Sequence, residues 1–121
     1  MASFFRPMLH QIMDTTNTNK ILKARCDMTT NKGIEKVHDT HVDFVDQISY
    51  KSVIFYVNET DGDTTLFNER YTSDFKDRTQ TIMKKVQPKE NRLLVFEGDL
   101  LHTGSSPINY SNRILINCNF I

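Results

Sequence analysis

The sequence predicts a mainly β protein that forms a single domain with one short helix at its start. Short runs of β-branched and aromatic residues recur along the chain, and clusters of turn-forming residues separate them. Helical spacing of apolar residues marks residues 1–14. A chain of 121 residues is below the size at which proteins divide into several domains. Many short strands joined by turns predict an antiparallel sandwich or barrel, and a jelly roll is the natural choice.

Residues 1–14 are expected to form an amphipathic helix. Its apolar residues recur at helical spacing and are Phe4, Phe5, Met8, Leu9, Ile12 and Met13. Ser3 is a suitable N-cap, and Pro7 lies near enough to the start of the helix to be tolerated. The polar stretch 15–19 then predicts a loop, and residues 20–121 are expected to form the jelly-roll core.

The strands of this core are predicted from local patterns. Residues 22–28 alternate between apolar and charged side chains, and residues 52–57 are β-branched and aromatic. The turn formers at 58–63 predict a hairpin to the next strand, whereas the polar, aperiodic residues 71–80 predict a loop. The expected strands are 22–28, 34–44, 52–57, 64–67, 81–86, 92–97, 100–103 and 113–121.

Composition argues against several classes of partner. Fifteen basic residues balance fifteen acidic ones without segregation along the chain, so no footprint for nucleic acid or anionic lipid is expected. No apolar run approaches the length of a membrane span, and the start of the chain resembles no export signal. A cytoplasmic protein without a membrane partner is therefore expected. In that setting Cys26 and Cys118 are expected to be buried thiols rather than a disulfide.

A candidate metal site begins at His41 and Asp43. These residues are two positions apart, so on a strand both side chains leave the same face and can converge on one ion. His102 is the best third ligand, because it lies just after a Gly-Asp turn on a short strand that a jelly roll can fold back over the first pair. Two histidines and one carboxylate are typical of iron(II) oxygenases and leave positions open for substrate and dioxygen. A pair of this spacing alone is more often structural, so the residues beyond His102 decide between a structural and a metal-binding role.

Arg113 opens the last expected strand. Its planar guanidinium suits two-pronged binding of a carboxylate in a partly dry pocket. Alternation along the strand places Arg113, Leu115, Asn117 and Asn119 on one face, and a polar face inside a barrel indicates a polar ligand. The alternative is an edge strand whose polar face meets solvent. The order of the motifs, His-x-Asp, then a distant His, then Arg, favours the ligand.

Several ordered blocks of the sequence resemble the 2-oxoglutarate and iron(II)-dependent oxygenases of the prolyl hydroxylase type, particularly compact versions found in marine phages. The blocks are HVDF at 41–44, IFYVN at 54–58 with DGDTT at 61–65, NRLLVFEGD at 91–99 with His102 after it, and RILIN at 113–117. The similarity runs from about Ile21 to the end of the sequence.

The resemblance implies a cupin-like double-stranded β-helix in which the three candidate ligands bind iron(II) and 2-oxoglutarate takes two of the open positions. Arg113 would then pair with the far carboxylate of this co-substrate. Tyr56 matches a family tyrosine that donates a hydrogen bond there, and Asn117 is a further candidate for the same subsite. In the family, dioxygen and 2-oxoglutarate are consumed, succinate and carbon dioxide are released, and the substrate is hydroxylated. The implied substrate is a peptidyl residue, most simply proline, or a small molecule.

Two other functions remain open from the sequence. A cupin-like isomerase or metal-binding module would share the fold and the metal without using 2-oxoglutarate, because a fold does not fix a function. A non-catalytic interaction domain is suggested by the short N-terminal region, since larger family members have several helices there. The presence of Arg113 together with all three metal ligands argues against the interaction domain, which has no need of all four.

Overall fold

The computed structural model describes residues 6–45 and 48–121. The predicted N-terminal helix is present as α1 (Arg6–Thr16), two residues longer than expected at its end. It ends where Asn17 adopts a positive φ of 55°, a conformation common just after helices. The expected cap at Ser3 lies outside the described residues. None of the described helices is both long enough and apolar enough to span a bilayer.

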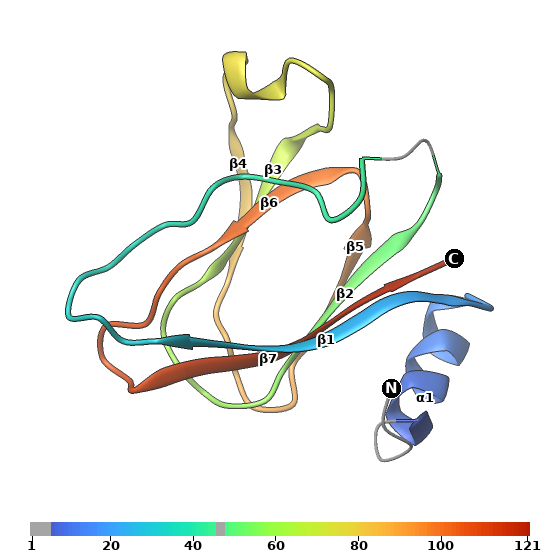
Figure 1. Ribbon diagram of the computed structural model, residues 1–121, viewed down its shortest axis with the longest axis horizontal. Coiled ribbons are helices and arrows are strands. Elements are labelled where there is room, and N and C mark those ends of the chain that lie inside the picture. Colours follow the sequence, from blue (N-terminus) through green and yellow to red (C-terminus); the bar gives the residue numbers. More distant parts are fainter. Residues whose placement is uncertain (1–5, 46–47) are drawn as a thin grey trace.

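The strands form two antiparallel sheets, which confirms the mainly β prediction (Figure 1). The larger sheet has the order β1 (Ile21–Thr30), β7 (Asn112–Phe120), β2 (Lys51–Tyr56) and β5 (Leu93–Glu97). The smaller sheet has the order β4 (Ile82–Val86), β3 (Thr64–Arg70) and β6 (Leu100–Gly104). The loop expected at 71–80 contains one short 3-10 helix, η2 (Phe75–Asp77).

The strand predicted over 34–44 is wrong as a regular element. This segment runs beside β6 (Figure 1), and its backbone forms two isolated bridges, from His41 to His102 in β6 and from Val37 to Ser105 just after it. Between the bridges the Thr103 hydroxyl donates to the carbonyl of His38, so a side chain also contributes to the pairing. The segment therefore lies alongside the smaller sheet as an extended chain without a continuous ladder.

The core is divided into two parts by the larger sheet. The cluster between the sheets contains Ile54, Tyr56, Leu66, Val86, Phe96, Leu100 and Leu115. The cluster between the larger sheet and α1 contains Leu9, Ile12, Val53, Ile116, Cys118 and Phe120. Strand β7 contributes to both, because Leu115 faces the smaller sheet while Ile116, Cys118 and Phe120 face the helix. This division matches the two faces predicted for the last strand.

The cysteine prediction is correct for one residue and wrong for the other. Both cysteines are free; Cys118 is buried, which raises the pKa of its thiol to about 11, whereas Cys26 is exposed. Cys26 lies on the outer face of the edge strand β1. Only the first part of that face packs against α1, where Ile21 and Ala24 join the helix cluster, and further along Met28 is 63% exposed.

Candidate metal centre

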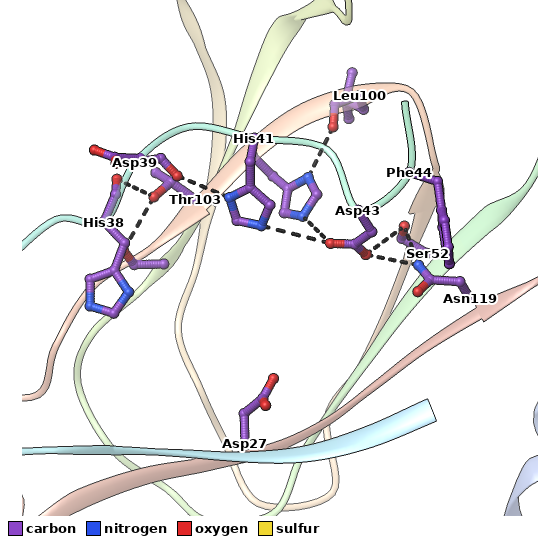
Figure 2. Close-up of polar contacts among 12 residues, drawn as sticks. Asp27, His38, Asp39, His41, Asp43, Phe44, Ser52, Leu100, Thr103 and Asn119 are labelled. Atoms are coloured by element: carbon purple, nitrogen blue, oxygen red, sulfur yellow. Dashed lines mark hydrogen bonds and ion pairs between the residues drawn. The ribbon is translucent and has the colours of Figure 1, made fainter. Parts of the chain in front are cut away.

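The three predicted metal ligands lie together although they come from distant parts of the chain. His41 and His102 are paired across the bridge between the 34–44 segment and β6, with the N–H of each donating to the carbonyl of the other at 2.9 and 3.1 Å. Antiparallel pairing of this kind places opposed side chains on the same face. Asp43 lies two residues after His41 and approaches both rings (Figure 2).

One atom from each side chain points at a common space. The distances to Asp43 Oδ1 are 3.7 Å from His41 Nε2 and 3.6 Å from His102 Nε2, and the three possible ligand atoms lie within 4.8 Å of one another. Bonds of about 2.1 Å at right angles would separate ligand atoms by about 3 Å. The arrangement therefore fits a divalent metal after a closure of less than about 1 Å between each histidine and the carboxylate and of up to about 2 Å between the two histidine nitrogens.

Hydrogen bonds behind the two imidazoles fix which nitrogen faces this space. His41 Nδ1 lies 2.9 Å from the carbonyl oxygen of Asp39, and His102 Nδ1 lies 3.0 Å from that of Leu100. A carbonyl only accepts hydrogen bonds, so each Nδ1 carries the proton and each Nε2 presents a lone pair. Metal-binding histidines are oriented by this type of contact.

The carboxylate of Asp43 is oriented in the same way. Its Oδ2 accepts hydrogen bonds from Asn119 Nδ2 at 2.8 Å and Ser52 Oγ at 3.3 Å, which leaves Oδ1 for the two imidazoles (Figure 2). Burial alone would raise the pKa of Asp43, but the nearby imidazoles of His102 and His41 and the hydrogen bond from Asn119 hold it well below its usual range. The Asp43 carboxylate is thus held in its ionised form, which is the form that binds a metal cation.

A pocket of about 400 Å³ opens beside this centre. Its walls include His41, His102, Arg113 and Asn117, so four of the six predicted site residues line one cavity. The volume lies toward the lower end of the range of about 300–1,000 Å³ for ligand pockets in proteins. The pocket therefore has the dimensions of a site for small molecules.

Arg113 is a buried cation without an anionic partner in the described part of the chain. Its side chain donates from Nε to the carbonyl of Gly62 at 2.7 Å and from Nη2 to Thr64 Oγ1 at 2.8 Å. No carboxylate of residues 6–45 and 48–121 forms an ion pair with it. Burial lowers the pKa of Arg113, but a guanidinium stays charged in proteins. A buried charge without a partner lowers the stability of the fold, so the Arg113 guanidinium is suited to binding an anion.

Thr64 joins Tyr56 to this anion site. Its Oγ1 accepts from the Tyr56 hydroxyl at 2.6 Å and from Arg113, so both lone pairs are occupied and its own hydrogen is free to donate. Thr64 lines the pocket, whereas Tyr56 is fully buried behind it. Tyr56 therefore reaches the pocket through Thr64, a residue that the sequence patterns did not single out.

Comparisons with known proteins leave the function open. No family model matches the chain, and no curated protein matches it. Among solved structures, it is similar to a chain described under the words "Bacillus endospore appendages form a novel family of disulfide-linked pili". The two are 12% identical with a TM-score of 0.41, and the similarity covers 85% of this chain and 91% of the other. A similarity of this level supports no conclusion about fold or function.

Proposed function

We propose that the protein is an iron(II)- and 2-oxoglutarate-dependent dioxygenase of the prolyl hydroxylase type. One observation carries the proposal: a buried arginine without an anionic partner among the described residues lines the same pocket as two histidines whose free nitrogens face a carboxylate. A metal site alone would fit many classes of protein. The addition of an anion site in the same cavity fits a co-substrate that binds the metal at one end and carries a carboxylate at the other.

His41, Asp43 and His102 would hold the iron, since two histidines and one carboxylate leave positions open for further ligands. Bound iron(II) supplies the activation of dioxygen, and the overall reaction converts dioxygen, 2-oxoglutarate and a substrate C–H group into succinate, carbon dioxide and a substrate C–OH group. The protein's part is to orient the ligands. Asn119 and Ser52 fix the Asp43 carboxylate, and backbone carbonyls fix both imidazoles.

Arg113 and Thr64 would bind the far carboxylate of 2-oxoglutarate. The guanidinium supplies charge and the Thr64 hydroxyl supplies the adjacent donor. Tyr56 acts behind them. Its hydroxyl donates to one lone pair of Thr64 Oγ1, and this hydrogen bond helps to orient the Thr64 hydroxyl so that its hydrogen points toward the co-substrate. Asn117 lies two positions beyond Leu115 on the same wall and remains a candidate for the co-substrate or for the substrate beside it.

The order of the elements supports a jelly roll of the double-stranded β-helix type as the proposed fold. The chain moves from β1 in the larger sheet to the 34–44 segment beside β6, then to β2 in the larger sheet. It continues through β3 and β4 in the smaller sheet, β5 in the larger, β6 in the smaller and β7 in the larger. Repeated passage between two facing antiparallel sheets is characteristic of this fold.

Anaerobic titration with iron(II), with and without 2-oxoglutarate, tests the proposal. We expect the weak visible charge-transfer band of iron-chelated 2-oxoglutarate in the wild type, its loss in His41→Ala, and its loss or weakening in Arg113→Ala. Arg78→Ala, which removes an exposed cation from an ion pair with Asp74, is the control and should leave the band unchanged. Tight iron binding without the band would favour a cupin-like metal protein, and absence of iron binding would favour an interaction domain.

A further inference from the structure

Strand β1 presents its polar face, not its apolar one, to the pocket. All five residues from Arg25 to Thr29 border the cavity, and the register with β7 places Arg25, Asp27 and Thr29 on the face of Asn117, Leu115 and Arg113. Cys26 and Met28 belong to the opposite face, where Met28 is 63% exposed and Cys26 is also exposed. A strand with one buried face normally places its apolar side chains there. Departures from such a local rule are expected at functional sites, so the inward charges indicate a polar ligand.

The Arg25–Asp27 pair leaves most of its binding capacity unused. Arg25 Nε donates to Asp27 Oδ2 at 2.8 Å, and within the described residues neither Asp27 Oδ1 nor the terminal nitrogens of Arg25 have a partner. The side chains are 47% and 39% exposed, and a pair this exposed contributes between about 0 and 1 kcal/mol to stability. Figure 2 shows the Asp27 carboxylate pointing from β1 toward the metal ligands, and Asp27 lines the same pocket as His41 and His102.

Asn117 supplies an independent sign of a missing ligand. It is the register partner of Arg25 on the neighbouring strand and lines the same pocket. The residue is 9% exposed, and its Oδ1 is buried without a hydrogen-bond partner among the described residues. Buried polar atoms in proteins are almost always paired, so this oxygen requires a group that donates a hydrogen bond.

We propose that the primary substrate is a free α-amino acid, held as a zwitterion by this wall of the pocket. Its ammonium group would donate to Asp27 Oδ1 and, once the Asn117 amide turns its oxygen toward the pocket, to Asn117 Oδ1, and its carboxylate would bind the terminal nitrogens of Arg25. The assignment rests on the proposed function, in which dioxygen and 2-oxoglutarate convert one C–H group of the amino acid to C–OH with release of succinate and carbon dioxide. Binding opposite the metal ligands would bring the amino acid side chain toward the iron.

Calorimetric titration of free amino acids into the anaerobic protein with iron(II) and 2-oxoglutarate tests the assignment. The panel contains L-proline, L-leucine, L-lysine, their N-acetyl and amide derivatives, and short peptides containing the same residues. At least one free amino acid should bind, and acetylation or amidation of it should weaken binding by about tenfold or more, the loss expected for one charge-assisted hydrogen bond. Asp27→Asn and Arg25→Gln should each weaken binding of the unmodified amino acid by a similar factor.

The matched control is Arg70→Gln, which breaks the exposed Arg70–Asp99 ion pair away from this pocket and should leave binding unchanged. The inference is overturned if no free amino acid binds, if the N-acetyl derivatives or peptides bind equally well, or if Asp27→Asn and Arg25→Gln behave like the control. The charge-transfer band is recorded on the same samples. A band without amino acid binding overturns the substrate assignment alone, whereas absence of the band overturns the proposed function and the assignment with it.

Discussion

Replacing Arg113 with methionine separates a ligand-binding role of the guanidinium from a structural one. Methionine keeps most of the length of the side chain and removes its charge. The change relieves a desolvation penalty of several kcal/mol for a cation that is 7% exposed and has no described carboxylate partner. It also removes hydrogen bonds to Gly62 and Thr64, each worth roughly 1.5–3 kcal/mol for a charged donor. The opposing terms are similar, so stability should change by no more than about 2 kcal/mol.

The effect on ligand binding should be much clearer. For 121 residues, an unfolding entropy of about 2.1 cal/mol/K per residue gives about 0.25 kcal/mol/K, so 1 kcal/mol corresponds to about 4 °C in Tm. Co-substrate at about 100 times its Kd should stabilise the iron-loaded wild type by about 2.7 kcal/mol, or about 11 °C. Arg113→Met should lose nearly all of this shift while unfolding within about 8 °C of the unliganded wild type.

Thermal unfolding measured by circular dichroism under argon, with iron(II) and with or without 2-oxoglutarate, gives both quantities. Arg78→Met is the control, because Arg78 is exposed and pairs only with Asp74 among the described residues. A full co-substrate shift in Arg113→Met would refute the assignment of the anion site. A loss of more than about 4 kcal/mol of stability without ligand would instead make Arg113 a structural residue.

Three further predictions concern the Asp43 carboxylate and the turn at Gly62. Asn119→Leu removes the main donor to Asp43 Oδ2 and should weaken iron(II) binding by about 10–100-fold, measured in competition with a chelator. Ser52→Ala loses only a 3.3 Å contact and should have a smaller effect. Equal iron(II) affinities of the two variants would contradict this ranking. The lowered pKa of Asp43 means that its ionised form stabilises the metal-free fold above the ordinary pKa of about 3.9 and that this contribution is lost as the pH falls below it. Urea unfolding of wild type and Asp43→Asn should therefore differ most above about pH 4, and a difference that grows toward low pH would be inconsistent with this sign. Gly62→Ala and Gly33→Ala both place an alanine at a positive φ, but only at Gly62 would the new Cβ lie 2.5 Å from a backbone carbonyl oxygen. Urea unfolding should therefore show that Gly62→Ala loses about 1–3 kcal/mol more unfolding free energy than Gly33→Ala. Equal losses in the two variants would contradict the close approach.

Much of the fold was predictable because local patterns reflect burial directly. Residues 52–57 and 113–121 combine β-branched side chains with turn signals, and both lie in strands of the larger sheet. The 34–44 segment was harder, because its pairing with β6 depends on two isolated bridges and a threonine hydroxyl rather than on a repeating pattern. The exposed position of Cys26 was also not predictable, since it depends on how far α1 reaches along β1.

The candidate site shows the same limit. Spacing placed His41 and Asp43 together, but only the antiparallel bridge brings His102 against them. Asn119 carried a usable signal, because it lies on the predicted polar face of the last strand. Ser52 carried none: a serine beginning a β-branched run does not reveal that its hydroxyl will contact a carboxylate from another segment.

Strand β7 contributes both to the stability of the fold and to the proposed chemistry. Its odd-numbered residues supply the anion site, a pocket wall and the donor to Asp43, while Ile116, Cys118 and Phe120 pack under α1. A register slip of one residue would exchange these faces and bury the polar groups under the helix, at a cost of several unsatisfied hydrogen bonds. The apolar contacts with α1 therefore hold the register of β7, and through it the relative positions of Arg113 and Asn119. The single helix thus packs behind the part of β7 that carries Asn117 and Asn119, although it covers only part of the larger sheet.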